Sequence, residues 1–511
     1  MPNEFRIPHS HRVSLPRANI LRAAFHGLIL LLALILGAPE IPAADVHHYT
    51  VKVDDTLDEL RVKACAAGSP HALAARSADA ERYLLEAHSI ASGNRIPLVS
   101  GHLSLADAKG CVEYRIDLRA AAQLIERYAQ LDDNNVATTS AVWLWRPVDQ
   151  GGFATEVRFE LADGLKVSVP WTLIDGSDPA RPLYSIPLSP QSDDAVTVFG
   201  RFHDCGIEVP GARLRTAVLR GRYGGAPDEL MAWIQSAASN VALAYGRFPN
   251  PSAQVIVVPV AKSSDDSREA CPFGHVIRDG GEAVQFFVNQ RRPHDEFIAD
   301  WTATHEFSHL LIPYITSDEK WISEGLASYY QNLLMARSGA YSQEKAWRKI
   351  VEGFQRGEES VPHLSLEDAM PVGSWDGIMK TYWGGAAVFL LADVELRAAS
   401  GNQESLDAVL DRLQACCLPP QRRWDGRTFF RKLDELSPFP LFERLYDRHR
   451  TSRRFPDYAA SLQDLGIRMD SGRIRLQNDA KLTDVRRAIM AAPTIIPKRH
   501  PGQGRECIGG T

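Results

Sequence analysis

The residues best suited to chemistry lie in the stretch T-H-E-F-S-H-L-L-I-P, from Thr304 to Pro313. In an α-helix, His305 and His309 stand one turn apart on one face, and Glu306 lies beside them. Such an i, i+4 pair presents two imidazole nitrogens to one Zn²⁺ ion without bending the backbone. The stretch therefore predicts two metal ligands, His305 and His309, and places Glu306 as a general base.

A second stretch, W-I-S-E-G-L-A-S-Y-Y from Trp321 to Tyr330, offers a third ligand. A catalytic zinc site uses three protein ligands and keeps one position for water. Glu324 on a second helix completes that set after a tight reversal of the chain near Pro313. Zinc there lowers the pKa of water and polarises a scissile carbonyl group, while Glu306 relays a proton to the leaving amine.

The alternative is a solvated helix that carries H-E-x-x-H by chance. The surroundings of Glu324 argue against it, because a charged residue between Trp321 and Leu326 on an apolar helix needs a partner. A bound metal supplies that partner.

The elements that must hold these residues carry their own signals. Pro293 and Asp295 come before the first stretch, apolar residues recur at helical spacing, and Pro313 follows. These signals predict one helix of about four turns.

Three patterns succeed one another along the 511 residues and predict a multi-domain α+β protein. Short alternating strands over residues 45–220 indicate a β-sandwich-like domain with helical insertions at Ala78 to Ala91 and Leu118 to Leu131. Residues 221–340 read as an α/β catalytic domain, and residues 341–470 as a helical region. The tail, 471–511, loses its pattern and is expected to be poorly ordered.

The segment F-G-H-V-I-R-D-G-G-E-A, from Phe273 to Ala283, joins two predicted strands of the catalytic domain. Its glycines would let backbone approach a substrate, and an edge strand near the metal could bind peptide by strand addition. A plain hairpin turn at Asp279-Gly280-Gly281 is an equal alternative.

Helix boundaries in the later region are marked by single residues. Apolar residues from Gly385 to Ala399 follow helical spacing and end before Gly401, and Ser405 begins the next helix. The arginines beyond residue 420 are interleaved with acids, which indicates a solvated face.

The first residues resemble an export signal. Arginines precede an apolar run from Ala23 to Ala38, and small residues lead to a cleavage site near Ala44. We therefore expect residues 1–44 to be a signal peptide of a periplasmic or secreted protein, without stable membrane insertion after cleavage. An uncleaved anchor is the alternative, but the run is shorter than the roughly 18–20 residues that span a membrane.

Charge argues against a nucleic-acid-binding protein, and the cysteines suggest one disulfide. The net charge of −6 and pI near 6.3 give no electrostatic footprint for nucleic acid. The seven cysteines form no C-x-x-C pair, and Cys65 with Cys111 is the first disulfide to test. Buried free cysteines are the alternative, and the odd count leaves at least one thiol or an intermolecular bond.

The motifs together resemble a known class of enzymes. H-E-F-S-H followed by W-I-S-E-G-L-A-S-Y-Y looks like the gluzincin zinc metallopeptidases, and T-Y-W-G-G-A-A-V resembles the Y-x-K-G-A segment of the aminopeptidase N family. The glycyl aminopeptidase family is closer, through L-L-A-D-V-E-L-R-A-A-S-G-N-Q-E-S-L-D-A-V-L. The resemblance spans roughly residues 46–467.

That resemblance implies roles for single residues. It implies zinc on His305, His309 and Glu324, Glu306 as base, and Tyr382 as the donor that stabilises the oxyanion. By itself, a tyrosine at the start of an apolar helix is more often a packing residue. The resemblance also implies a thermolysin-like catalytic domain.

Three departures from the family pattern stand out. The spacer before Glu324 is shorter, Gly384 replaces the lysine of Y-x-K-G-A, and no G-x-M-E-N signature precedes the zinc helix. Gly280-Gly281-Glu282 lies in a comparable place, where Glu282 could hold a substrate α-amino group.

The sequence thus predicts an exported zinc metallopeptidase that acts on peptides or proteins, with aminopeptidase action favoured over endopeptidase action. A non-catalytic binding or scaffold protein that keeps the fold is one alternative, which an intact Glu306 disfavours. Hydrolysis of another small substrate by the same zinc chemistry is a second alternative. Oligomeric state is not readable from the sequence.

Overall fold

The computed structural model describes residues 46–106, 108, 110–123, 134–149, 152–186, 194–220, 226–260, 269–420 and 422–493, and the backbone of 506 and 507. The predicted signal peptide, residues 1–44, lies outside these ranges. Within them, no helix is both long and apolar enough to cross a membrane.

The N-terminal region is built on a seven-stranded sheet of order β12-β13-β10-β1-β2-β7-β4. Its central strands alternate buried and exposed residues, so that one face packs on a core. Its strands are β1 (Val46–Val53), β2 (Glu59–Cys65), β4 (Leu84–Ser89), β7 (Cys111–Asp117), β10 (Ala154–Glu160), β12 (Thr172–Leu173) and β13 (Leu183–Ile186). A disulfide joins Cys65 to Cys111 where β2 and β7 lie in register, which confirms that pairing.

Two smaller sheets and three short helices complete this region. Buried tryptophans, Trp143, Trp145 and Trp171, fill the shared core. The sheets are β5 (Leu98–Val99), β6 (His102–Ser104), β3 (Ala72–Ala74) and β9 (Arg146–Pro147), and β11 (Lys166–Ser168), β14 (Val196–Gly200) and β8 (Asn135–Thr139); the helices are α2 (Ala80–Tyr83), α3 (Leu118–Ala122) and α4 (Ser140–Trp143).

One of the two predicted helical insertions is shorter in the structure, and the other lies partly outside the described residues. The helix expected from Ala78 to Ala91 ends at Tyr83, because the next six residues pair with β7 as strand β4. In the second insertion, α3 covers Leu118–Ala122, and residues 124–131 lie outside the described ranges. Tertiary strand pairing therefore overrode a local helical pattern.

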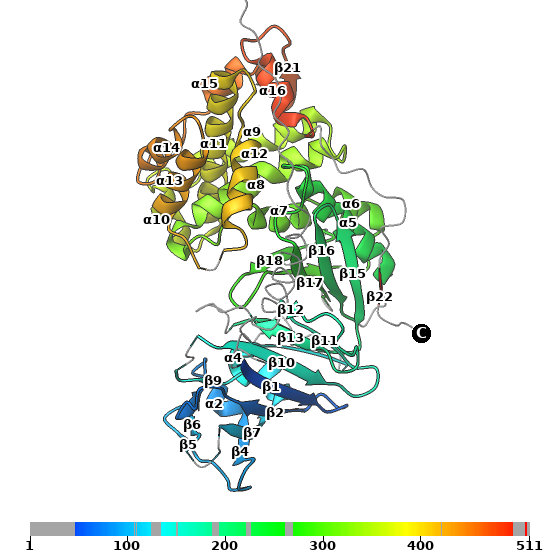
Figure 1. Ribbon diagram of the computed structural model, residues 1–511. Coiled ribbons are helices and arrows are strands. Elements are labelled where there is room, and N and C mark those ends of the chain that lie inside the picture. The colour runs from blue at the N-terminus through cyan, green and yellow to red at the C-terminus, as the bar shows by residue number, and fades with distance from the viewer. Residues whose placement is uncertain are drawn as a thin grey trace, which may run out of the picture. The chain divides into compact units, whose positions relative to one another are not determined.

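The stretch from Thr304 to Pro313 packs against a mixed six-stranded sheet of order β18-β19-β17-β16-β15-β22 (Figure 1). Its strands are β15 (His203–Val209), β16 (Ala212–Val218), β17 (Ser252–Pro259), β18 (Phe273–Ile277), β19 (Ala283–Val288) and β22 (Glu506–Cys507), and α5 (Pro227–Ala242) packs on it. The sequence prediction ended the β-rich domain at residue 220, whereas β15 and β16 belong to this sheet. Strand β18 lies at its edge.

The remaining described chain is mostly helical. The helices are α6 (His294–Ala299), α7 (Thr302–Ser308), η2 (His309–Leu311), η3 (Ser317–Glu319), α8 (Lys320–Arg337), α9 (Gln343–Glu359), α10 (Leu366–Ala369), η4 (Met370–Val372), α11 (Trp375–Ser400), α12 (Leu406–Cys417), α13 (Gly426–Leu436), α14 (Phe442–His449), α15 (Ala459–Asp464) and α16 (Thr483–Met490). As predicted, α11 ends at a left-handed Gly401, and Ser405 caps α12.

The tail departs from its prediction of poor order as far as residue 493. Strands β20 (Ile467–Asp470) and β21 (Arg473–Leu476) form a hairpin, and α16 follows. Val485 and Ile489 are buried in the main core, and Arg486 donates to the carbonyl of Leu465 at 2.9 Å. The burial of two apolar residues and the hydrogen bond from Arg486 hold the segment in place.

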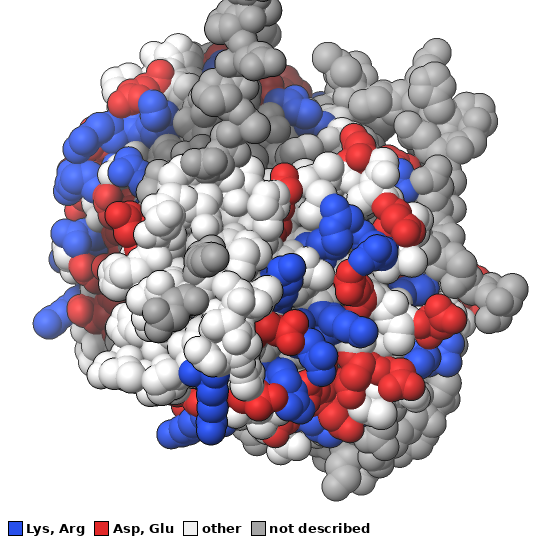
Figure 2. Space-filling view, turned by 60° about the horizontal axis from the view of Figure 1, so that its bottom comes forward, with Lys and Arg blue, Asp and Glu red and all other residues white. Residues whose placement is uncertain are grey.

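Figure 2 shows one face of the molecule. Lysine and arginine side chains are mixed with aspartate and glutamate over one part of this face, and another part carries no charge. Neither sign of charge dominates it.

Candidate active site

Four elements bring the predicted site residues together. His305 and Glu306 lie on α7, His309 begins η2, Glu324 lies on α8, and Tyr382 lies on α11. The predicted four-turn helix is instead divided into α6 and α7, because the backbone of Asp300 is extended and its carboxylate accepts the amide hydrogen of Thr302 at 2.7 Å. This break gives α7 a start of its own just before His305.

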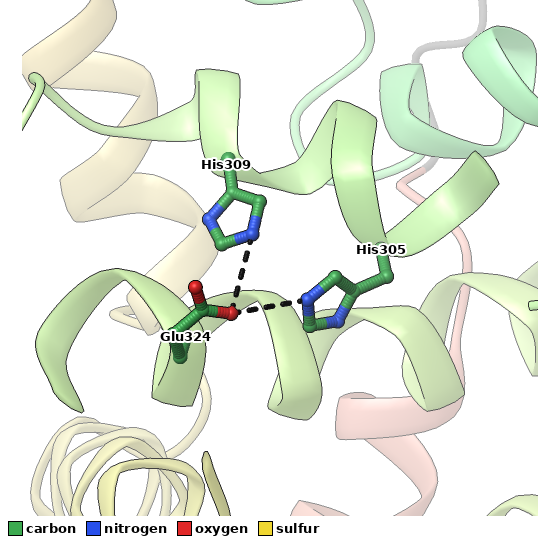
Figure 3. Close-up of side chains that lie close together, drawn as sticks. All are labelled: His305, His309 and Glu324. Carbon is green, nitrogen blue, oxygen red and sulfur yellow. Dashed lines mark hydrogen bonds and ion pairs between the residues drawn. The ribbon is translucent and has the colours of Figure 1, made fainter. Parts of the chain in front are cut away.

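The two histidines and Glu324 converge on one point (Figure 3). Nε2 of His305 lies 3.3 Å from Oε2 of Glu324, and Nε2 of His309 lies 3.4 Å from the same oxygen. The three possible ligand atoms all lie within 4.8 Å of one another.

These separations test whether zinc fits. Bonds of about 2.0–2.1 Å from a tetrahedral zinc to nitrogen and oxygen place two ligand atoms roughly 3.3–3.4 Å apart. The histidine-to-glutamate distances match that edge length, and two imidazoles with one carboxylate form a known catalytic donor set. The residues present therefore fit zinc.

The charges at this cluster depend on one another. Burial alone would raise the pKa of Glu324, but the charge of His309 and hydrogen bonds from both histidines lower it. Burial alone would lower the pKa of His305, but the hydrogen bond to Glu324 and the charge of Glu306 raise it. The pocket thus stabilises positive charge beside Glu324, as a cation site requires.

Glu306 lies against the backbone of the edge strand. A Cβ atom on Gly274 of β18 would stand 2.4 Å from Cγ of Glu306, so only glycine allows this approach. Burial raises the pKa of Glu306, and the charges of His309 and His305 only partly offset it. A carboxylate with a raised pKa is suited to accepting and returning a proton near neutral pH.

Tyr382 faces the same cluster from α11. Its ring centroid lies 5.8 Å from that of His305, and its hydroxyl hydrogen-bonds Glu324. Burial, with the charges of Glu324 and Glu306, raises the pKa of Tyr382, so the hydroxyl stays protonated and can donate. The residue lies inside α11, which begins at Trp375, and not at its start as the sequence indicated.

Two glycines fix the spacing between Glu324 and Tyr382. Helices α8 and α11 cross where Gly325 meets Gly385, and a Cβ atom on Gly325 would lie 2.4 Å from Cα of Gly385. A Cβ atom on Gly385 would lie 2.0 Å from the carbonyl oxygen of Trp321. The backbones themselves therefore make the contact.

Gln331 is a site residue that the sequence analysis missed. Its buried Oε1 lies 2.7 Å from Nδ1 of His305, which turns Nε2 toward Glu324. Its spacing could have revealed it, because Gln331 follows Glu324 by two helical turns and so lies on the same face of α8.

Glu282 is engaged elsewhere in the structure. Its carboxylate pairs with Nε of Arg278 at 2.9 Å, and both residues are partly buried. Arg278 also donates to the carbonyl oxygens of His309 at 3.2 Å and Ile312 at 2.7 Å. The pair thereby links the β18–β19 hairpin to the segment that follows α7.

The departure at Gly384 has a steric reason. A Cβ atom there would lie 2.4 Å from Cδ2 of Leu366, because α10 packs directly on this part of α11. A lysine, as in Y-x-K-G-A, would require at least the buried Leu366 side chain to shift.

One family model matches this chain. The M61 glycyl aminopeptidase model covers residues 300–368, which include His305, Glu306, His309 and Glu324 and end before Tyr382. The resemblance that the motifs indicated is thereby confirmed. No curated protein matches the chain by sequence.

Solved structures are similar at low sequence identity. An aminopeptidase N family protein from Idiomarina loihiensis has a TM-score of 0.60 and 14% identity, over 82% of this chain and 78% of that chain. An M1 zinc metallopeptidase from Deinococcus radiodurans has a TM-score of 0.47 and 12% identity, over 81% and 95%. The first likeness shows that this chain shares the fold of an aminopeptidase N family protein.

Proposed function

We propose that this protein is a zinc-dependent peptidase with aminopeptidase action. The convergence of His305, His309 and Glu324 at 3.3–3.4 Å carries the proposal, with Glu306 and Tyr382 on either side. A zinc ion held by the three ligands would polarise the scissile carbonyl and lower the pKa of the attacking water.

The chain's own residues supply the remaining chemistry. Glu306 takes a proton from the attacking water and delivers it to the leaving amine, for which its raised pKa suits it. The Tyr382 hydroxyl donates a hydrogen bond to the oxyanion that forms at the carbonyl carbon. Gln331 holds the His305 ring in the orientation that the metal requires.

Aminopeptidase action is favoured over endopeptidase action because the matching family model and the structure from Idiomarina loihiensis both carry that name. Glu282 stays the proposed contact for a substrate α-amino group. Its pairing with Arg278 sets a condition, because the substrate must share the carboxylate with that guanidinium group. Glu282→Gln should then raise KM for peptides with a free amino terminus and leave blocked peptides unaffected.

One experiment tests both parts of this proposal. Zinc content is measured in wild type and Glu306→Gln, and both are incubated with free and N-acetylated forms of one peptide. We expect one zinc per chain in both proteins, hydrolysis of the free peptide by wild type, and loss of about 10²–10⁴-fold in kcat in the variant. Wild type without zinc would refute the metal site, and cleavage of the acetylated form would indicate an endopeptidase.

We also propose that the protein is exported to the periplasm or secreted. The arginines and apolar run of residues 1–44 support this, and the Cys65–Cys111 disulfide suits an oxidising compartment. N-terminal sequencing of the exported protein should find a chain that starts near residue 45; a chain that starts at residue 1 would contradict it.

A further inference from the structure

Large apolar side chains are exposed at few places in the described part of the chain after residue 200. They are Phe273, Trp301, Val372 and Trp375. Trp301 directly precedes α7 and Trp375 begins α11, and both of these helices hold site residues. Phe273 lies on β18, which contacts Glu306, and Val372 ends η4, before α11. Exposed apolar groups that gather around one site mark a binding surface.

Trp301 stands directly beside the metal ligands. It precedes His305 by one helical turn, and the two ring centroids lie 5.6 Å apart, edge to face. The tryptophan is 36% exposed, whereas His305 is 3% exposed. Its free face can therefore cover a side chain next to the bond that is cut.

Trp375 stands further from the metal on the same helix as Tyr382. It is 70% exposed and precedes Tyr382 by seven residues, which places both on one face of α11, with Ile378 between them. At 1.5 Å per residue the separation along the helix is about 10 Å. An extended peptide covers that length in about three residues.

Phe273 borders the site on the side of the sheet. It is 36% exposed on the edge strand β18, directly before Gly274, whose backbone lies against Glu306. Phe273 therefore offers an apolar contact at the edge of the sheet that lies beside Glu306.

We infer that these side chains are subsites for large apolar residues of an extended peptide substrate. Trp301 and Phe273 contact residues next to the scissile bond, and Trp375 contacts a residue about three positions from it. This inference rests on the proposed peptidase function and adds its substrate class: unfolded segments of at least four residues, rich in aromatic or large aliphatic side chains.

The test compares long and short substrates. Trp375→Ala and the control Val99→Ala, which removes an exposed side chain of the N-terminal region, are assayed with a leucyl anilide and with hexapeptides that carry Phe or Ser at each position in turn. We expect Trp375→Ala to lower kcat/KM for one Phe hexapeptide about tenfold relative to the anilide, and Val99→Ala to change neither. A relative change of less than about twofold at every Phe position would overturn the inference.

A binding measurement separates this inference from the proposed function. Tryptophan fluorescence of Glu306→Gln, titrated with the same hexapeptides, reports binding without hydrolysis. Weaker binding of the Phe peptide after adding Trp375→Ala or Trp301→Ala supports the subsites even if wild type hydrolyses nothing, in which case the peptidase proposal alone fails. Equal binding by all three proteins would refute the subsites even if wild type is an active peptidase.

Discussion

Two buried polar clusters lie along helices α8 and α11, and they differ in charge balance. One is the site around Glu324 and Tyr382. The other lies further along both helices, where Tyr329 donates to Asp393 at 2.9 Å and Tyr330 donates to Asp407 at 2.8 Å.

The difference between the clusters lies in what faces the carboxylates. Asp393 pairs with Arg397 at 2.9 Å, and Asp407 pairs with Arg337 at 2.8 Å and with Arg397 at 2.9 Å. The charges that act on Glu306 and Glu324 come from the two histidines and from each other. A cluster that neutralises itself joins helices, whereas one that needs an added cation is a place for chemistry.

The largest effect is expected from breaking the neutral cluster. Asp407→Asn leaves Arg337 and Arg397 buried with less negative charge and should lower the free energy of unfolding by about 3–5 kcal/mol. Denaturant unfolding followed by circular dichroism measures this loss, and the folded variant should still bind zinc.

The control for that variant lies on the same helix. Asp411→Asn removes an exposed pair with Arg247, 2.7 Å apart, and should cost no more than about 1 kcal/mol. Equal losses from Asp407→Asn and Asp411→Asn would show that burial does not distinguish these pairs.

The next prediction compares two tyrosines, one of which should affect kcat and the other mainly stability. Tyr382→Phe should lower kcat by about 10²–10³-fold with zinc content unchanged, because the oxyanion donor is lost. Loss of its hydrogen bond to Glu324 should cost only about 1 kcal/mol of stability, because a bound metal still faces that carboxylate. Tyr329→Phe should do the reverse and cost about 1–3 kcal/mol of stability while kcat is kept. If Tyr382→Phe lowers stability and leaves kcat intact, Tyr382 is a packing residue.

A smaller effect is expected at the strand that contacts Glu306. Gly274→Ala places a methyl group against Cγ of Glu306 and should lower kcat about 10–100-fold through misplacement of the base. Gly206→Ala in β15 is the control, because its Cβ would meet only the movable end of the Arg213 side chain. Similar kinetics for both variants would show that β18 does not position Glu306.

The smallest effect concerns a buried base that belongs to neither cluster. Burial, with the charge of Arg448, lowers the pKa of His449 to about 4, below its ordinary value near 6.5. The folded protein favours the neutral imidazole of His449. This preference contributes fully to the free energy of unfolding above about pH 6.5, and the contribution is lost as the pH falls toward 4. Between pH 7.5 and 5.0, wild type should lose on the order of 1–2 kcal/mol more stability than His449→Gln.

The sequence predicted the three proposed metal ligands because their spacing is local. His305 and His309 are neighbours on one helical face, and Glu324 lies on the next helix along the chain. Tyr382 came from the family resemblance, since nothing in its local pattern separates a donor from a packing residue.

The residues that were missed depend on contacts between distant segments. Gly274 matters because β18 meets α7, and Gly385 matters because α11 meets α8. The helix expected from Ala78 to Ala91 failed for a similar reason, since its second half pairs with β7. Local spacing carries no information about which partner a segment will meet.

The crossing of α8 and α11 at Gly325 and Gly385 limits which amino-acid substitutions these helices tolerate. Most side chains of α8 and α11 can be exchanged for others of similar size while the two helices keep their separation. At these two positions even one methyl group forces the helices apart, and Glu324 and Tyr382 move with them. The distance between Glu324 and the Tyr382 hydroxyl is thus set by backbone atoms, so the apolar side chains elsewhere on both helices can vary without changing it.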